Sequence, residues 1–377
     1  MARWDIFCVV IDNYGDIGVC WRLARQLAAE HGLQVRLWVD ELPALQKIQP
    51  ETQLIPNQQL CGIEVCEWRE HTDFSQVQVA DAVVEAFACD VPELYVQKMA
   101  QRETAPRWFN LEYLTAESWA QDCHGLTSLH ARYPLKKEFF FPGFAAGMGG
   151  LIREGHILAE RDQLQSKQEA RLAFLAGLGV QPVKDARLIS LFAYENPALA
   201  SLFDAMSKGS EAVHVLVPEG RVMASVEAFL GHSLLPGKTE QSGNLYLQAL
   251  PFMAQQDYDR LLWCCDMNCV RGEDSFVRAQ WAATPLLWHI YVQEDDAHLI
   301  KLEAFLDLYC ADLPVTVAQA VRSLWLAWNR GEDCGPHWQA FTQHWPALQQ
   351  HARNWSAQQV AHGDLAANMV QSCINLI

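Results

Sequence analysis

The chain has 377 residues, more than one ordinary domain of roughly 150 residues requires, so its length predicts two or three domains. Hydrophobic residues make up 50% of the chain and charged residues 19%, which excludes global disorder and predicts a large core. The net charge of -17 argues against a nucleic-acid-binding protein that neutralises phosphates, but it is compatible with one local basic pocket for an anionic ligand.

The first third of the chain alternates between strand and helix patterns. A continuous apolar run at 4–11 predicts a buried strand, and a polar, glycine-containing turn follows at 12–18. The next predicted elements are a helix at 19–30, a strand at 34–39, a strand at 80–84, a helix at 92–100 and a strand at 107–111. This rhythm predicts an α/β sheet with helices on both faces.

The segment 142–150 contains four glycines and a proline, and its composition predicts an exposed, flexible linker. A helix is expected at 166–176, with Ser166 and Glu169 at capping-box spacing. The same rhythm then restarts, with strands at 186–192, 212–217, 244–250, 266–270 and 285–290, helices at 197–207, 255–264 and 276–283, and a mostly helical remainder.

We therefore expect three regions. Residues 1–150 form an N-terminal Rossmann-like domain, and residues 151–355 form a second Rossmann-like domain. Residues 356–377 form a C-terminal helix that can pack back on the first domain. Because ligands bind at the carboxyl ends of parallel strands, two such domains facing each other predict a cleft between them.

Targeting and metal signals are absent from the sequence as given. The N-terminus has no signal-peptide pattern, and no window offers about 20 apolar residues for a membrane span. The twelve cysteines show no zinc-site spacing and do not form the framework of a short secreted domain. We expect a cytoplasmic protein with reduced thiols, without a metal, a membrane or a nucleic acid as partner.

The turn after the first strand reads D-N-Y-G-D-I-G and carries Asp12 and Asp16. It lacks both the dinucleotide fingerprint and the P-loop pattern, and its two carboxylates would repel a pyrophosphate. Two carboxylates four residues apart can hold a cationic acceptor, and one can act as general base. Helix capping by either aspartate is the structural alternative. We also predict donor contacts from Asn13, Tyr14 and Gly15.

A second turn, R-G-E-D-S at 271–275, stands between a predicted strand and a predicted helix. The N–H groups at the start of that helix can bind a diphosphate, so we assign donor-binding roles to Arg271, Gly272, Asp274 and Ser275. Glu273 can bind sugar hydroxyls. Helix capping is again the alternative.

Four further side chains are candidates for the donor site. Phe252 can stack on a base, with core packing as the alternative, and Gln255 can read the edge of that base. Tyr194 and Tyr291 each follow a predicted strand and can line the same site, although turn or packing roles explain them equally well.

Four segments together resemble the EarP family of bacterial elongation factor P arginine rhamnosyltransferases, and the resemblance covers essentially the whole chain. They are D-N-Y-G-D-I-G-V-C-W-R-L-A-R-Q-L from residue 12, P-G-F-A-A-G-M-G-G-L-I-R-E from 142, V-R-G-E-D-S-F-V-R-A-Q-W from 270 and P-L-L-W-H-I-Y-V-Q-E-D-D-A-H from 285.

The resemblance implies a GT-B fold with two facing Rossmann-like domains, in which residues 1–150 lie on the acceptor side and residues 151–355 bind the donor. It also implies inverting, metal-independent transfer of rhamnose from dTDP-β-L-rhamnose, used as a substrate and without a cofactor. The acceptor is an arginine in the N-terminal domain of elongation factor P, and the modified factor rescues ribosomes stalled at proline runs. By the same resemblance, Asp12, Asp16 and Glu273 match essential residues, and Phe252 with 271–275 matches the nucleotide-diphosphate site.

Asp16 is our expected general base and Asp12 its orienting partner, although the sequence leaves open which of the two takes the proton. The alternatives are another GT-B nucleotide-sugar transferase or epimerase acting on a small acceptor, and a non-catalytic partner protein. The double-aspartate turn fits a cationic acceptor better than a neutral sugar. A phosphate-binding turn is not needed by an interaction surface.

Overall fold

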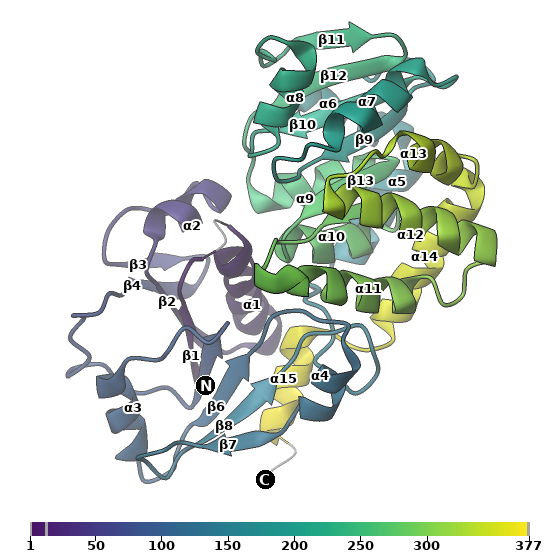
Figure 1. Cartoon of the computed structure of the whole chain (residues 1–377). Coiled ribbons are helices and arrows are strands. Elements are labelled where there is room, and N and C mark those ends of the chain that lie inside the picture. The colour runs from purple at the N-terminus through teal and green to yellow at the C-terminus, as the bar shows by residue number, and fades with distance from the viewer. Residues whose placement is uncertain (1, 12–13, 375–377) are drawn as a thin grey trace. The chain divides into compact units, whose positions relative to one another are not determined.

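A computed structural model describes residues 2–11 and 14–374. The chain forms two compact units (Figure 1): unit 1 comprises Met1–Gly155 and Gln359–Ile377, and unit 2 comprises His156–Gln358. Among the described residues, no helix combines the length and the apolar character needed to cross a membrane. Each unit is built around its own sheet and is described separately.

Unit 1 contains a sheet of eight described strands in the order β3-β4-β2-β1-β5-β6-β8-β7. The strands are β1 (Arg3–Cys8), β2 (Gln34–Val39), β3 (Asn57–Leu60), β4 (Ile63–Glu67), β5 (Ala82–Ala86), β6 (Arg107–Leu111), β7 (Thr127–Leu129) and β8 (Lys136–Phe140). The six inner strands are parallel, and only β3 and β7 at the edges run antiparallel. The order reverses between β1 and β5, which makes this a doubly wound sheet.

Helices cover both faces of this sheet. They are α1 (Gly15–His31), α2 (Leu42–Ile48), α3 (Glu93–Ala100), α4 (Ser118–Cys123) and α15 (Leu365–Ile374). One face packs Phe7, Val83 and Trp108 against α3 in an aromatic-rich core. On the opposite face, α1 packs on β1 and β2, and α15 packs on α1 (Figure 1).

A buried charge lies at the centre of the α3 face. Asp5 has no exposed surface and accepts two hydrogen bonds from Arg36, at 3.2 and 2.6 Å. Its carboxylate also accepts from the Trp38 indole at 3.2 Å and from the Tyr95 hydroxyl at 2.6 Å. Because a charge taken out of water must be paired, this network joins β1, β2 and α3 in one arrangement.

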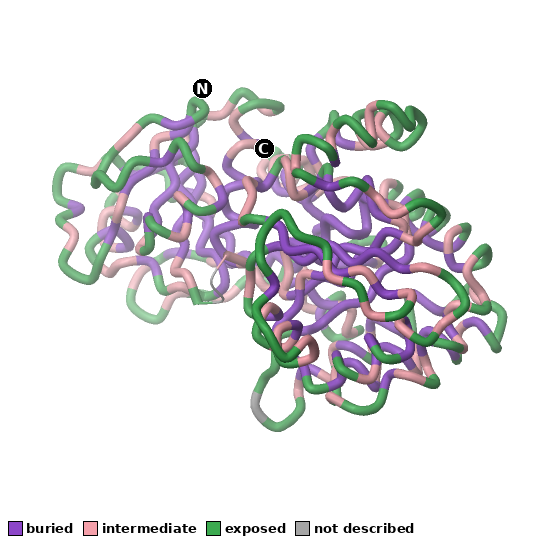
Figure 2. Tube along the Cα trace, turned by 90° about the horizontal axis from the view of Figure 1, so that it is seen from above, coloured by how far each residue is buried: buried purple, intermediate pink, exposed green. Residues whose placement is uncertain are grey.

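Unit 2 contains a sheet of six described strands in the order β11-β12-β10-β9-β13-β14. The strands are β9 (Arg187–Leu191), β10 (Val213–Pro218), β11 (Thr239–Ser242), β12 (Leu245–Leu250), β13 (Met267–Arg271) and β14 (Leu286–His289). All except the edge strand β11 are parallel, and the order reverses between β9 and β13. The inner strands are buried along most of their length. Figure 2 marks the buried residues of the chain in purple.

Two groups of helices enclose the second sheet. One face carries α5 (Ile157–Ser166), α6 (Gln168–Gly177), α9 (Gln255–Cys264) and α10 (Asp274–Ala282). The rest of the unit is formed by α7 (Leu199–Lys208), α8 (Met223–Leu230), the short 3-10 helix η1 (Glu294–Asp296), α11 (Ala297–Tyr309), α12 (Val315–Arg330), α13 (Gly335–Thr342) and α14 (Trp345–Val360). The prediction of an α/β protein with two parallel-rich sheets is confirmed.

The prediction of an exposed, flexible linker at 142–150 is wrong. Phe144 and Met148 are only 4% and 6% exposed, and the Gly149 N–H donates to the Phe141 carbonyl at 2.9 Å. A Cβ on Gly149 would lie 2.7 Å from the Phe140 ring and 2.9 Å from the Phe141 carbonyl oxygen. Glycine is therefore needed here for close packing inside unit 1, and the unit boundary lies further on, between Gly155 and His156.

The capping box expected at Ser166 and Glu169 is also absent. Ser166 ends α5, and its hydroxyl donates back to the Gln163 carbonyl at 3.1 Å. Lys167 occupies the N-cap position of α6 instead, without a side-chain capping bond. A serine hydroxyl satisfies a carbonyl at a helix C-terminus as readily as an N–H at an N-terminus, so the spacing alone misplaced the boundary.

We predict that Gly149→Ala destabilises unit 1 by about 1–3 kcal/mol, because the added methyl group must displace a ring and a backbone carbonyl. Urea unfolding followed by tryptophan fluorescence measures the change. Gly177→Ala is the matched control, since a Cβ there meets nothing within 4 Å, and it should leave stability unchanged or raised. Equal stability of the Gly149→Ala variant and the wild type would contradict the packing argument.

Candidate active site

The two reversals of strand order identify the candidate site in each unit. In a doubly wound sheet, the loops that follow the two strands at the reversal leave toward opposite faces and open a crevice. In unit 1 these are the loops after β1 and β5, and in unit 2 the loops after β9 and β13. Both polar turns singled out in the sequence follow one of these strands.

The first turn leads from β1 into α1. Asp16 lies in the first turn of α1 and is only 3% exposed. Its Oδ2 accepts a hydrogen bond from the Ile11 N–H at 2.8 Å, which closes the loop. Asp40, which directly follows β2, also holds this loop, because its Oδ1 accepts from the Val10 N–H at 3.0 Å. Burial raises the pKa of Asp40.

The structure describes only some of the other residues that were predicted to act in this turn. Asp12 and Asn13 lie outside the described residues. Tyr14 occupies the N-cap position of α1 without a side-chain capping bond, and Gly15 is the first residue of the helix. The roles predicted for these residues and for Asp16 stay predictions.

The loop after β5 is packed against the same strand end. The Cys89 thiol donates to the Phe7 carbonyl at 3.2 Å, which ties this loop to β1. Phe87 and Ala88 both have positive φ angles, of 56° and 52°, a conformation that non-glycine residues adopt at an energetic cost. The Phe87 ring stacks on Tyr113, which follows β6, with centroids 4.5 Å apart.

The second turn leads from β13 into α10. Gly272 has a φ of 58°, which a glycine adopts without strain. Its carbonyl accepts from the Trp288 indole at 2.8 Å. The Ser275 hydroxyl donates to the Arg271 carbonyl and accepts from the Arg271 N–H at 3.2 Å, so the turn closes on itself. Glu273 occupies the N-cap position without a side-chain capping bond.

Arg271 connects the two strands at which the strand order of unit 2 reverses, because it ends β13 and contacts residues that follow β9. Its guanidinium carbon lies 4.7 Å from the ring centroids of both Phe192 and Tyr194, which follow β9. The residue is 7% exposed, and within the described part of the chain its buried Nη1 atom has no hydrogen-bond partner. A buried guanidinium nitrogen without a partner is costly unless a ligand supplies an acceptor. The arrangement is therefore suited to an anion.

Aromatic rings continue from Arg271 toward the end of β14. Tyr194 makes edge contacts with His289 at 5.2 Å and with Tyr291 at 5.9 Å between ring centroids. His289 is 5% exposed, whereas Tyr291 is 43% exposed. Burial, followed by the charges of Arg271 and His298, lowers the pKa of His289 to about 4. At neutral pH the His289 side chain beside Arg271 is thus uncharged.

The residues predicted to contact the base lie at the start of α9. Phe252 is half-buried in the connection from β12 to α9. Gln255 is the first residue of α9, and its Nε2 donates to the Asp274 carboxylate at 3.1 Å. The structure thus brings Gln255 and Asp274 together, and it brings Arg271, Tyr194 and Tyr291 together. The assignment of these residues to donor binding stays a prediction.

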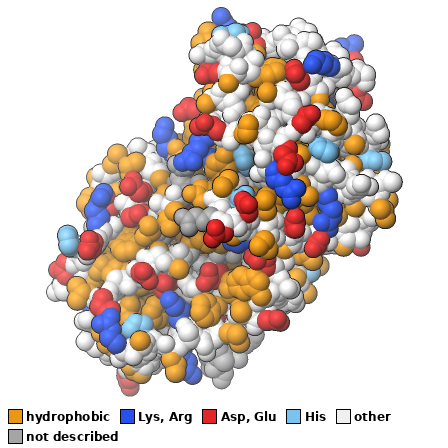
Figure 3. All heavy atoms as spheres, in the orientation of Figure 1, with side chains coloured by type: hydrophobic (Ala, Val, Ile, Leu, Met, Phe, Trp, Pro, Cys, Tyr) orange, Lys and Arg blue, Asp and Glu red, His pale blue; other side chains and the backbone are white. Residues whose placement is uncertain are grey.

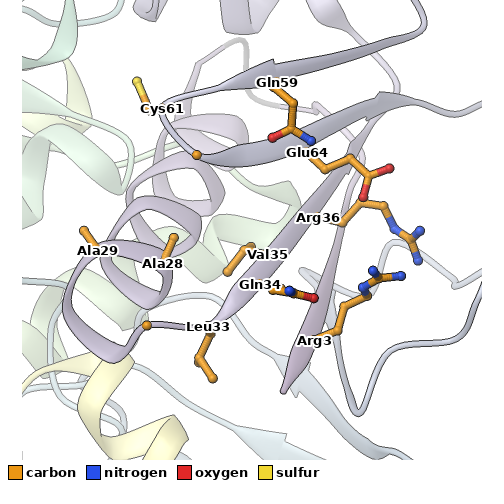
Figure 4. Close-up of a pocket in the computed structure, with 12 residues that line it drawn as sticks. Arg3, Ala28, Ala29, Leu33, Gln34, Val35, Arg36, Gln59, Cys61 and Glu64 are labelled. Carbon is orange, nitrogen blue, oxygen red and sulfur yellow. The ribbon is translucent and has the colours of Figure 1, made fainter. Parts of the chain in front are cut away.

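A separate hollow of about 550 Å³ lies in unit 1 (Figure 4). Its lining includes Arg3 and Gln34, at the first residues of β1 and β2, and Cys61 in the β3–β4 turn. It therefore lies at the amino ends of the strands, opposite the edge from which the Asp16 turn leaves. Arg36, which also lines it, is already paired with Asp5. Nothing in this hollow belongs to the predicted site.

The chain is similar to known proteins over almost its whole length. The family model described as Elongation-Factor P (EF-P) rhamnosyltransferase EarP matches residues 4–374. The chain belongs to this EarP family. It is 54% identical to the protein-arginine rhamnosyltransferase of Pseudomonas putida over 371 residues, with 98% of each chain covered. Its identity to the enzyme of the same description from Neisseria meningitidis serogroup B is 35%, covering 93% of this chain and 91% of the relative.

Solved structures agree with the membership of the EarP family. The chain matches, with a TM-score of 0.73 and 43% identity over the full length of both chains, a structure described as the structural basis for EarP-mediated arginine glycosylation of translation elongation factor EF-P. A UDP-GlcNAc 2-epimerase from Neisseria meningitidis matches with a TM-score of 0.52 at 8% identity, which shows a shared fold alone. The prediction of a glycosyltransferase with GT-B architecture is confirmed at the level of family and fold.

Three contributors near the candidate site were not assigned from the sequence. Phe192 stacks on Arg271, and His289 borders the same guanidinium. The pair formed by Asp259 and Arg278 lies one helical turn behind Gln255 and Asp274. Phe192 was within reach of prediction, because it follows the first strand of the second unit at the reversal of strand order.

We predict that His289 makes the stability of the folded protein depend on pH. An unfolded histidine binds a proton near pH 6.5, whereas folded His289 does so only near pH 4. Stability is therefore lost as the pH falls from 6.5 to 4, by up to about 3 kcal/mol from this residue. His289→Gln should flatten that part of the curve in urea unfolding at a series of pH values. His232→Gln, at an exposed histidine, should leave the curve unchanged, and a parallel flattening there would contradict the assignment.

Proposed function

We propose that this protein transfers L-rhamnose from dTDP-β-L-rhamnose, with inversion, to one arginine in the N-terminal domain of elongation factor P, in the cytoplasm. Membership of the EarP family and the 52–54% identical relatives support a protein-arginine rhamnosyltransferase. The donor nucleotide, the acceptor protein and the stereochemistry are the parts that the proposal adds. They account for both polar turns of the structure at once.

The donor-binding part of the proposal rests on the buried Nη1 atom of Arg271, which has no acceptor among the described residues. A nucleoside diphosphate supplies anionic oxygens of the right kind, and a guanidinium binds phosphate oxygens in a fork geometry. The adjacent start of α10 adds N–H groups that the carbonyls of the helix cannot satisfy. Together these groups stabilise the charge that develops on the leaving diphosphate, so the proposal includes no metal ion.

The acceptor half rests on the turn after β1. An arginine guanidinium stays protonated because its pKa exceeds about 12, and it is a poor nucleophile in that form. We infer that Asp12 and Asp16 orient it by charge-assisted hydrogen bonds. As the C–N bond to the anomeric carbon forms, the C–O bond to the diphosphate breaks and the proton passes from the guanidinium to Asp16. Glu273 is proposed to hold the sugar hydroxyls.

The protein as a whole carries a charge of -17, and Figure 3 shows acidic side chains distributed among basic and apolar ones over the face in view. A cationic arginine acceptor suits a site built from carboxylates, because attraction between opposite charges persists over about 8–10 Å at moderate salt. A small neutral sugar gains nothing from such a site. This favours the protein acceptor over the alternative of a transferase or epimerase for small molecules.

We predict that elongation factor P incubated with the protein and dTDP-β-L-rhamnose gains the mass of one deoxyhexose, and that Asp16→Asn lowers the rate at least 100-fold. Intact-mass spectrometry of the factor measures both. Asp40→Asn is the matched control, since Asp40 makes an equivalent hydrogen bond to the same loop, and it should stay within a few-fold of wild type.

The absence of any mass gain with the wild-type enzyme would overturn the proposed function. Full activity of a folded Asp16→Asn variant would overturn only its role as the base. Release of a free modified sugar without a mass gain on the factor would favour the epimerase or small-acceptor alternative.

We also predict that Phe252→Ala weakens dTDP binding about 5- to 150-fold, because stacking of a base on an aromatic ring contributes roughly 1–3 kcal/mol. Titration calorimetry with dTDP measures the change. Phe174→Ala, at a partly buried phenylalanine of α6 in the same unit, tests for indirect effects and should bind dTDP normally. Unchanged affinity of Phe252→Ala would place that ring in the core.

A further inference from the structure

The two helices that begin at the candidate donor site run side by side. Helix α9 follows β12 and α10 follows β13, and the two helices pack against each other on one face of the unit 2 sheet (Figure 1). Gln255 is the first residue of α9 and Asp274 the first residue of α10, and the 3.1 Å hydrogen bond between their side chains joins the two starts. The two N-termini therefore lie level with each other.

A second bond between the helices lies one turn further on. Arg278 donates through Nε to Asp259 Oδ1 at 3.1 Å and through Nη2 to Asp259 Oδ2 at 2.8 Å. Arg278 is 1% exposed and Asp259 is 4% exposed. Each residue stands four positions after the first residue of its helix, on the side that faces the neighbour, so the two bonds lie about 6 Å apart along parallel axes.

A bidentate pair restrains two helices differently from apolar packing. Two parallel N–H···O bonds fix both the distance between the helices and their relative height, because sliding by a fraction of an ångström misaligns both bonds. Apolar side chains interdigitate with less directional preference. Buried ion pairs are also poor contributors to stability, since desolvation offsets much of the attraction. A role in geometry explains this pair better than a role in stability.

We propose that the Arg278–Asp259 pair is a positioning element of the donor site, which sets the height of α10 against α9. By doing so it holds the R-G-E-D-S turn, with Ser275 and Asp274, level with Gln255 and Phe252, so that diphosphate and base are bound together. The proposal rests on the proposed function, because it presumes that these two helix starts bind dTDP-rhamnose. Arg278 and Asp259 themselves lie behind the site, so they act through Asp274 and Gln255.

The far half of α10 is held independently of this pair. The Trp355 indole of α14 donates to Gln280 Oε1 at 2.6 Å, and Arg161 of α5 donates to the Trp281 carbonyl at 2.8 Å. Residues 275–282 of α10 are all buried. We therefore expect α10 to stay folded when the pair is removed, while its N-terminal turn shifts.

The test compares two buried ion pairs of the same chemistry. Asp259→Asn/Arg278→Met removes the pair behind the donor site, and Asp5→Asn/Arg36→Met removes the bidentate pair in unit 1. Double substitutions avoid leaving one charge buried without its partner. Titration calorimetry with dTDP and steady-state kinetics, with dTDP-rhamnose and elongation factor P varied in turn, are measured on the full-length protein.

We expect the Asp259→Asn/Arg278→Met variant to bind dTDP at least ten-fold more weakly and to show a raised KM for the donor, with the KM for elongation factor P unchanged. The Asp5→Asn/Arg36→Met variant should bind dTDP within two-fold of wild type. Arg278→Lys keeps the charge but loses the fork geometry, so it should weaken dTDP binding at least three-fold. If the double variant does not fold, the dTDP affinity of Arg278→Lys alone tests the positioning role of the pair.

Wild-type affinity for dTDP in a folded Asp259→Asn/Arg278→Met variant, or in Arg278→Lys when that variant decides, overturns the positioning role. Equal weakening by the unit 1 control overturns it as well, because the effect would then be a general loss of stability. Failure of the proposed function has a different signature: the wild-type protein binds no dTDP, or Phe252→Ala and Ser275→Ala bind it with wild-type affinity.

Discussion

The direction of parallel strands is the constraint on which the candidate site depends. Every parallel strand delivers its following loop to the same edge of the sheet, and the reversal of strand order separates two of these loops to opposite faces. In unit 1 the reversal lies between β1 and β5, and in unit 2 between β9 and β13. The turn that holds Asp16 and the turn that holds Arg271 occupy equivalent positions in their units. Each of the two sheets thus has one edge that is suited to ligand binding. Two different substrates can therefore bind at the two edges.

In each unit, a buried ion pair restrains the elements from which the candidate site is built. In unit 1, Asp5 and Arg36 join two neighbouring strands to α3, and in unit 2, Asp259 and Arg278 join two neighbouring helices. Such pairs contribute little net stability, but they permit few alternative arrangements. The site itself then tolerates features that are individually unfavourable. Examples are the buried guanidinium of Arg271 and the positive φ angles of Phe87 and Ala88.

Much of the fold could be predicted from the sequence, because buried parallel strands leave continuous apolar runs with polar turns after them. The strands at 34–39 and 107–111 and the helix at 255–264 have the predicted bounds. Glycine was the misleading signal. In 142–150 it permits close packing, and the same residue type also marks flexible linkers, so composition alone cannot separate the two uses.

The site was predictable where a turn follows a strand directly, as at 271–275. Contacts between distant segments left no local pattern. The stacking of Phe192 on Arg271 and the pairing of Asp259 with Arg278 join residues 79 and 19 positions apart in the chain, and a single sequence does not show which of its many aromatic or charged residues meet. The residues 12–13, which carry one of the predicted catalytic groups, lie outside the described part of the structure.

The return of the chain to unit 1 has a consequence for biosynthesis. Asp364 accepts a hydrogen bond from Gln26 at 2.9 Å, Asn368 donates to the Gly149 carbonyl at 3.0 Å, and Ser372 donates to Glu138 at 3.0 Å. Unit 2 is continuous in sequence, whereas unit 1 lacks α15 until unit 2 has been translated. Because domains fold as units during synthesis, the unit that begins first is completed last. Until α15 has been synthesised, the face of α1 that it covers stays open to water.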